Sequence, residues 1–170
     1  MSTVYAKREY SFRRLFRLFL NFLAKKLPVS GYTRLKIYRC MGVNIEKGNG
    51  RCGIVCFDTI HPEDIHIGKG CEIVDGCTIL SHFYDVVDMT AHRHYRGKII
   101  IGRNVYIGTN TIIVKPVTVG DGAIIGAGSV VNKDIPPYQV WAGVPAKFIK
   151  NRYSENNFIP LSTEEFKSKS

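Results

Sequence analysis

Aliphatic residues recur every six positions along the second half of the chain. Between residues 101 and 132, Ile or Val opens every six residues, and Gly follows it in four of the six cases. A fixed six-residue period predicts a parallel β-helix, in which each six supplies one short strand and one turn, and three sixes complete a triangular coil. The aliphatic residue points inward, and Gly, Asn and Asp suit the corners. The in-phase positions are Ile101, Ile107, Ile113, Val119, Ile125 and Val131.

The same phase occurs upstream, at Ile67, Ile73 and Ile79. From Ile79 to Ile101 the separation is 22 residues rather than six, so 16 residues are inserted at one corner, over about 82–98. Insertions at the corners of a solenoid often form its binding face, so candidate chemistry is expected there. Before residue 67 the period is irregular. The inward candidates in that part are Ile45, Ile54, Ile60 and Ile65.

The N-terminal residues follow a helical rather than a six-residue pattern. Residues 9–27 place apolar side chains at helical spacing with arginines towards the other side, and Pro28 ends the helix. A second short helix is predicted over 31–42. Phenylalanine and leucine opposite arginine are typical of a helix lying on a membrane surface, and a helix capping the open end of the solenoid is the alternative. The two roles are compatible. The apolar positions are Phe12, Leu15, Phe16, Phe19, Phe22 and Leu23.

Charge and composition add limits to this picture. The net charge is +10, but residues 1–39 carry ten Lys or Arg and one Glu, so the basicity belongs to the N-terminal segment. No nucleic-acid-binding motif accompanies this charge, and no nucleic-acid partner is expected. The apolar run 18–24 is too short for a secretory signal or a membrane span. Five cysteines without a CxxC favour reduced thiols in a cytoplasmic protein, peripheral at the inner membrane face if the helix binds lipid. The expected organisation is a helical segment at 1–42, the β-helix at 43–150 and a tail at 151–170.

Three stretches near the end of the solenoid resemble the closing signature of the hexapeptide-repeat acyltransferases, in the branch of galactoside, maltose and polysaccharide O-acetyltransferases. They are residues 126–131 (GAGSVV), 133–137 (KDIPP) and 142–147 (AGVPAK). The resemblance covers roughly residues 54–152. It implies an all-β, left-handed parallel β-helix. It also implies a homotrimer with active sites between neighbouring subunits, and acetyl transfer from acetyl-CoA without a metal.

The resemblance also implies a catalytic residue. His82 stands where the inserted loop begins, the place of the family's catalytic histidine, and imidazole can accept a proton at neutral pH. His82 is therefore the expected general base, acting without an acyl-enzyme. Asp85 is expected either to orient the imidazole or to bind substrate. Asp58 is expected to contact substrate, and His92 and His94 to line the acceptor pocket from the loop.

Coenzyme contacts follow from the same resemblance. Small residues are needed where the pantetheine lies against backbone, and Gly108 and Ala127 match those positions. Tyr106 stands where the family often has tryptophan, and Asn132 and Lys133 match residues near the pantetheine and the pyrophosphate. Basic residues that meet the nucleotide phosphates are commonly arginine, which lysine replaces without the planar fork. The matching positions here are Lys147 and Lys150.

These observations predict an O-acetyltransferase acting on a sugar or lipid-linked sugar in cell-surface polysaccharide biosynthesis. An enzyme for a small soluble acceptor (serine, an antibiotic or a simple galactoside) is the first alternative, and a non-catalytic β-helix scaffold the second. A γ-class carbonic anhydrase on the same solenoid would need three zinc-binding histidines, and the five histidines show no paired spacing on strand faces.

Overall fold

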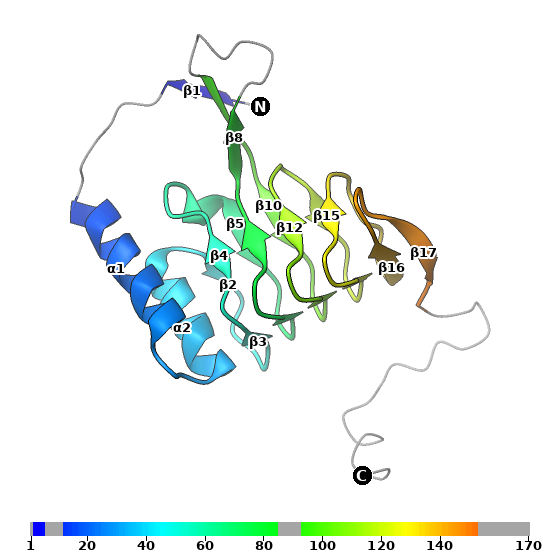
Figure 1. Ribbon diagram of the computed structural model, residues 1–170, viewed down its shortest axis with the longest axis horizontal. Coiled ribbons are helices and arrows are strands. Elements are labelled where there is room, and N and C mark those ends of the chain that lie inside the picture. The colour runs from blue at the N-terminus through cyan, green and yellow to red at the C-terminus, as the bar shows by residue number, and fades with distance from the viewer. Residues whose placement is uncertain (1, 6–11, 85–92, 153–170) are drawn as a thin grey trace.

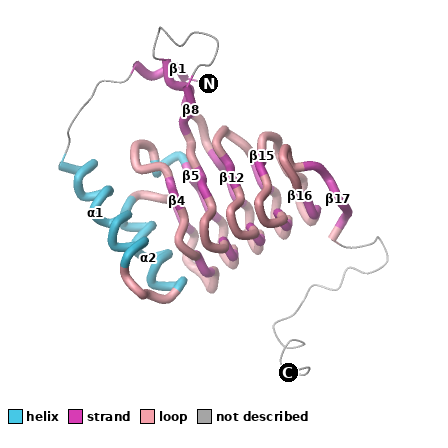
Figure 2. The backbone as a smooth tube through the Cα atoms, viewed as in Figure 1, coloured by secondary structure: helices cyan, strands magenta, loops and turns pink. Residues whose placement is uncertain are grey.

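The computed structural model describes residues 2–5, 12–84 and 93–152, and most of them form a solenoid of short parallel strands (Figures 1 and 2). The strands stack into three sheets, named here faces 1, 2 and 3 in chain order. Face 1 contains β2 (Asn44–Ile45), β5 (Ile65–Ile67), β10 (Ile99–Ile101) and β13 (Thr118–Val119). Face 2 contains β3 (Arg51–Cys52), β6 (Glu72–Ile73), β11 (Tyr106–Ile107), β14 (Ile124–Ile125), β16 (Gln139–Ala142) and the antiparallel β17 (Lys147–Asn151). Face 3 contains β4 (Cys56–Phe57), β7 (Thr78–Ile79), β12 (Ile112–Ile113) and β15 (Val130–Val131).

The six-residue period is confirmed as the repeat that fills the core. Every in-phase aliphatic from residue 67 to 131 is buried, and each pairs in register with its counterpart one coil away. Ile107, for example, lies between Ile73 and Ile125 on face 2. Burial of nearly the whole side chain stabilises the fold by about 1.5–3 kcal/mol for each such residue.

The first coil departs from the prediction. Ile45 and Ile65 are buried as expected, but the expectation for Ile54 and Ile60 is wrong, because both side chains are exposed. Cys52 and Phe57 take the inward positions instead, in register with Ile73 and Ile79 of the next coil. Spacings of seven, five and ten residues separate the inward positions 45, 52, 57 and 67, which explains why no clean period exists there.

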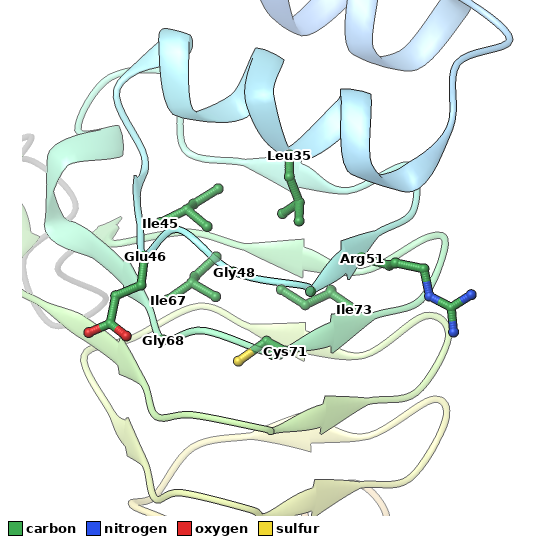
Figure 3. Close-up of a pocket in the computed structure, with 11 residues that line it drawn as sticks. Leu35, Ile45, Glu46, Gly48, Arg51, Ile67, Gly68, Cys71 and Ile73 are labelled. Atoms are coloured by element: carbon green, nitrogen blue, oxygen red, sulfur yellow. The ribbon is translucent and has the colours of Figure 1, made fainter. Parts of the chain in front are cut away.

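The helix α2 (Gly31–Met41) closes the open end of the solenoid, as Figure 3 shows for the surroundings of Leu35. Its Tyr38 is fully buried, donates to the Val55 carbonyl at 3.0 Å, and packs edge-on against Phe57 with ring centroids 4.8 Å apart. Below Leu35, the hollow between α2 and the first coils measures only about 10 Å³, roughly enough for one water molecule. This end of the solenoid is a packed cap and not a ligand site.

The helix α1 (Phe12–Lys26) lies outside α2 (Figure 1). It confirms the predicted amphipathic helix, and it ends two residues before Pro28. Its Ala24 is buried, and Leu20 packs against the core cluster. Within residues 2–5, 12–84 and 93–152, no helix is long and apolar enough to cross a membrane.

The insertion extends from the corner between faces 3 and 1 as a hairpin. Its strands are β8 (His82–Tyr84) and β9 (Arg93–Arg96), and β1 (Ser2–Tyr5) adds a third antiparallel strand beside β9. A short 3-10 helix, η1 (Pro62–Asp64), lies in the corner of the preceding coil. The loop tip at 85–92 and most of the predicted tail at 151–170 lie outside the described residues.

Candidate active site

His82 is placed at the root of the inserted hairpin by the strand that precedes it. Strand β7 ends at Ile79, its inward position, and the chain leaves face 3 through Leu80 and Ser81. The Leu80 N–H donates to the Ile113 carbonyl at 2.8 Å, which continues the ladder to the point of departure. The imidazole is therefore carried by a rigid corner, with its side chain 20% exposed.

Asp58 lies directly beside this imidazole, because its coil stacks on that of His82. Phe57 pairs in register with Ile79, so the residue that follows Phe57 reaches the corner where His82 begins. The distance from His82 Nδ1 to Asp58 Oδ2 is 2.5 Å, and the carboxylate is fully buried. A buried carboxylate beside an imidazole is the arrangement that fixes the tautomer of a catalytic histidine.

The Asp58 carboxylate has hydrogen bonds on both oxygens. Oδ1 accepts from the backbone N–H groups of Ile60 at 2.8 Å and His61 at 3.0 Å. Oδ2 accepts from the Ser81 hydroxyl at 2.7 Å and the Ser81 N–H at 3.2 Å, in addition to His82. These contacts turn the Asp58 carboxylate towards the Ser81–His82 corner, where it lies beside His82 Nδ1. Contact of Asp58 with substrate stays a prediction.

These hydrogen bonds shift the pKa values of both Asp58 and His82. Burial alone would raise the pKa of Asp58, but the hydrogen bonds from His82, the His61 N–H and Ser81 hold this pKa well below its ordinary value of 3.8. The hydrogen bond to Asp58 raises the pKa of His82 above 6.5, against a smaller opposing effect of burial. With Nδ1–H donated to Asp58, the neutral imidazole carries its lone pair on Nε2. That nitrogen is the one able to accept a proton.

The corner 58–64 that carries Asp58 is itself anchored by two arginines. Arg96 of β9 forms a paired contact with Asp64, at 2.7 Å from Nε and 3.2 Å from Nη2. Arg17 of α1 donates to the Ile60 carbonyl at 3.0 Å and pairs with Glu63 at 3.2 Å. Bidentate guanidinium contacts add geometric specificity. The N-terminal helix and the base of the hairpin therefore both fix the corner that holds the Asp58 carboxylate.

The predicted loop residues cannot all be placed. Asp85 and His92 lie outside the described residues. His94 belongs to β9, where its backbone pairs with Tyr84, but its side chain lies outside the description. His61 was not singled out from the sequence, and its ring lies 6.2 Å from that of His82, centroid to centroid. Ser81 and Arg96 were not singled out either. The contacts of all three residues involve the irregular first coil, which gives no periodic signal in the sequence.

The predicted coenzyme residues lie mainly on face 2 and at its corner with face 3. Tyr106 points outward from β11, and the exposed Lys147 and Lys150 lie on β17. Gly108 and Ala127 occupy equivalent corners one coil apart, so closely stacked that a Cβ on Gly108 would lie 2.6 Å from the Ala127 nitrogen. The glycine is thus required by coil packing as well as suited to a groove. The remaining two, Asn132 and Lys133, follow β15 at the corner between faces 3 and 1.

Within one chain, Gly108 and Ala127 do not lie beside His82, although Asn132 and Lys133 lie at the same corner of the solenoid as His82. Gly108 and Ala127 lie where the chain turns from face 2 to face 3, whereas His82 lies where it leaves face 3 for face 1. Face 3 therefore separates the two groups.

Two further features bear on the location of the site. A groove of about 520 Å³ lies on face 1, lined by Asn44, His66, Ile100 and their neighbours, and includes none of the predicted site residues. In the part of the chain that the structure describes, no three His, Cys, Asp or Glu side chains gather to hold a metal ion. The five cysteines are free thiols, and Cys71 and Cys77 are buried in the core.

Comparison with known proteins agrees with this architecture. Residues 98–133 match the family model described as bacterial transferase hexapeptide (six repeats). The protein of Bacillus subtilis named Putative acetyltransferase YvoF is 30% identical over 142 residues, which cover 84% of this chain and 80% of that protein.

Two solved structures share the fold and 26% identity. A maltose O-acetyltransferase from Clostridium difficile superposes with a TM-score of 0.66, over 84% of this chain and 87% of that one. A galactoside acetyltransferase in complex with coenzyme A superposes with a TM-score of 0.63, over 89% and 86%. The shared fold is the left-handed parallel β-helix, an exception to the usual right-handed crossover of parallel strands.

Proposed function

Because this chain belongs to the hexapeptide-repeat acetyltransferases, and is thus an acetyl-CoA-dependent acyltransferase, we propose that it acetylates a sugar hydroxyl with His82 as general base. The observation that carries the proposal is the hydrogen bond of 2.5 Å between His82 Nδ1 and the buried Asp58 carboxylate. It selects the tautomer whose Nε2 accepts a proton.

The chemistry follows from that tautomer. Nε2 of His82 takes the proton of the acceptor hydroxyl as its oxygen attacks the thioester carbonyl carbon. The C–S bond of the resulting tetrahedral intermediate then breaks, and Nε2–H returns the proton to the departing coenzyme A sulfur. Asp58 remains ionised throughout and stabilises the imidazolium that forms between the two steps. A backbone N–H from a neighbouring coil stabilises the oxyanion.

The coenzyme site is formed by two copies of the chain in a homotrimer. This proposal is supported by the separation of His82 from Gly108 and Ala127 across face 3, since a second copy can present its own groove to the His82 corner. The pantetheine then lies along Gly108 and Ala127. Tyr106, Asn132 and Lys133 flank the coenzyme, and Lys147 and Lys150 meet its phosphates.

The acceptor is a sugar, and within that class a lipid-linked sugar of cell-surface polysaccharide synthesis. The names of the maltose and galactoside acetyltransferases support a sugar. The basic N-terminal segment supports an acceptor held at a membrane. Asp85, His92 and His94, on or beside the loop tip, are the candidates for contacting it.

Release of free thiol from acetyl-CoA tests the proposal. The purified protein is assayed with simple sugars, nucleotide-sugars, a lipid-linked sugar and serine, in parallel with the His82→Ala and His66→Ala variants. His66, a half-buried histidine on face 1, is the matched control. We expect turnover with a sugar and a loss of about 10²–10⁴-fold for His82→Ala alone.

Other outcomes contradict separate parts of the proposal. Equal turnover by wild type and His82→Ala would remove His82 as the base. Preference for serine would refute the sugar acceptor and leave the base in place. Turnover with simple sugars but not with the lipid-linked one would refute only the polysaccharide assignment.

A further inference from the structure

Helix α1 turns its apolar side away from the protein. The side chains that face the protein are Arg17, Leu20 and Ala24, spaced as one stripe of a helix. The backbone carbonyl of Ala24 also accepts a hydrogen bond from Arg34 of α2 at 2.8 Å. The inner side of α1 therefore contacts the rest of the chain through a small residue, one leucine and an arginine, and the Asn21 side-chain oxygen is buried as well.

The opposite side is a continuous apolar surface, named here the α1 apolar face. Phe12 is 83% exposed, Leu15 67% and Phe22 57%. A soluble protein rarely leaves a contiguous group of large apolar side chains in water, and such a group marks a site of interaction. The face comprises Phe12, Leu15, Phe16, Leu18, Phe19 and Phe22.

The charge of α1 indicates what covers this face. The helix contains five Lys or Arg and no acidic residue. Arg13 and Lys26 are exposed, and Arg14 and Lys25 are half-buried. Two copies meeting through this face would bring like charges together, which opposes self-association. A surface that is apolar inside and anionic outside complements the helix on both counts.

We propose that α1 docks the protein onto an anionic phospholipid membrane, with the α1 apolar face inserted at the level of the headgroups and the basic residues on the lipid phosphates. The anchors on the opposite side of the helix fix the orientation. Arg17 binds the Ile60 carbonyl and Glu63, in the corner that carries Asp58, so the side of α1 that faces away from this corner is the side that enters the lipid.

Sedimentation with vesicles tests this docking with the full chain. Phosphatidylcholine vesicles are compared with vesicles that also contain phosphatidylglycerol, in the absence of acetyl-CoA and acceptor, so a failure here leaves the proposed acetyl transfer standing. We expect binding to the anionic vesicles, weakened by about tenfold or more in Phe12→Gln/Phe19→Gln. Ile149→Gln, an exposed apolar residue on β17 at the other end of the solenoid, should bind as wild type.

A second pair of variants tests the charge. Arg14→Gln/Lys26→Gln should weaken binding to the anionic vesicles by about five-fold for each charge removed, and the effect should shrink at high salt. Lys69→Gln/Lys115→Gln removes the same charge from exposed corners of the solenoid and is the matched control.

Light scattering of the same proteins without vesicles separates the alternatives. The proposal requires an unchanged molar mass in Phe12→Gln/Phe19→Gln. A lower mass would show that the face is covered by a second copy, and would overturn the proposal. Absence of wild-type binding to anionic vesicles would overturn the proposal. An equal loss of vesicle binding in Ile149→Gln or in Lys69→Gln/Lys115→Gln would overturn it as well.

Discussion

Replacing Asp58 with Asn tests the proposed base most directly, because the two side chains have the same shape. The introduced amide must choose an orientation. With its NH₂ towards His82 it strands one backbone donor, the Ser81 N–H. With its NH₂ on the other side it strands two, the N–H groups of Ile60 and His61. The first orientation leaves fewer backbone N–H groups without an acceptor and is therefore favoured. The imidazole must then accept a hydrogen bond at Nδ1.

The consequence for catalysis follows from that reversal. When Nδ1 of His82 accepts from the introduced amide, the neutral imidazole carries its hydrogen on Nε2, which can no longer take a proton from the acceptor. The variant should lose most of the contribution of a positioned base, about 10²–10⁴-fold in kcat, or roughly 3–5 kcal/mol of barrier. The stranded Ser81 N–H should lower the free energy of unfolding by about 1–3 kcal/mol.

The assay is thiol release as a function of pH, with kcat and KM for acetyl-CoA measured separately. In the wild type, kcat should rise with pH through the raised pKa of His82, above 6.5. In Asp58→Asn the contact that raises this pKa is gone, so the residual activity should rise at lower pH. KM for acetyl-CoA should not change, because Asp58 is buried and makes no contact with Tyr106, Gly108 or Ala127.

A matched control separates chemistry from folding. Asp121→Asn also removes a carboxylate that accepts a backbone N–H, that of Arg103 at 2.7 Å, but on an exposed corner remote from His82. It should retain wild-type kcat. A folded Asp58→Asn protein with wild-type kcat would refute the reasoning. Loss of activity without movement of the pH profile would reduce Asp58 to a structural role.

Two further predictions concern stability. His82→Gln should lower the free energy of unfolding by about 1.5–3 kcal/mol between pH 3.8 and 6.5, where Asp58 is ionised and His82 protonated, as measured by denaturant titration. The difference should decline above this window, as pH rises through the raised pKa of His82, and below it, as pH falls through the lowered pKa of Asp58; a difference independent of pH would contradict the ion pair. Gly108→Ala should lower the free energy of unfolding by about 1–3 kcal/mol and raise KM for acetyl-CoA, because its Cβ would lie 2.6 Å from the Ala127 nitrogen. At Gly128 an added Cβ meets nothing within 4 Å but φ is +67°, so Gly128→Ala should cost about 1–2 kcal/mol from backbone strain alone. An unchanged KM for acetyl-CoA in Gly108→Ala would contradict the proposed groove.

The regular part of the solenoid was predictable because one physical constraint repeats. An inward aliphatic every six residues stacks on its counterpart three sixes away, so the positions from 67 to 131 and the corner that holds the insertion could be located from the sequence. In the first coil the constraint is different. Phe57 is inward because Tyr38 of α2 packs on it, and neither contact leaves a periodic signal. Isoleucine at 54 and 60 is more apolar than cysteine at 52, but register decides which side chain points inward.

The same irregularity hid the contact between Asp58 and His82. The inserted loop located His82, whereas the position of Asp58 relative to His82 depends on the first coil, whose inward positions are irregularly spaced. The sequence also identified the two sides of α1 without showing which side meets the protein. The contacts of Arg17 with the corner 58–64 determine which side of α1 meets the protein, and these partners are distant in sequence. Helical periodicity carries no information about such contacts.

The corner 58–64 relates the two proposals to each other. One end of it supplies the carboxylate that orients His82, and its middle binds Arg17 on the inner side of α1. If the outer side of α1 lies in the headgroup region, the base is held close to the membrane surface, and an acceptor attached to lipid reaches it without leaving that surface. A freely soluble acceptor gains nothing from this arrangement. Vesicle binding together with turnover of simple sugars only would therefore mean that docking serves location and not substrate access. Vesicle binding together with preference for a lipid-linked sugar would mean that α1 contributes to specificity without touching the reacting atoms.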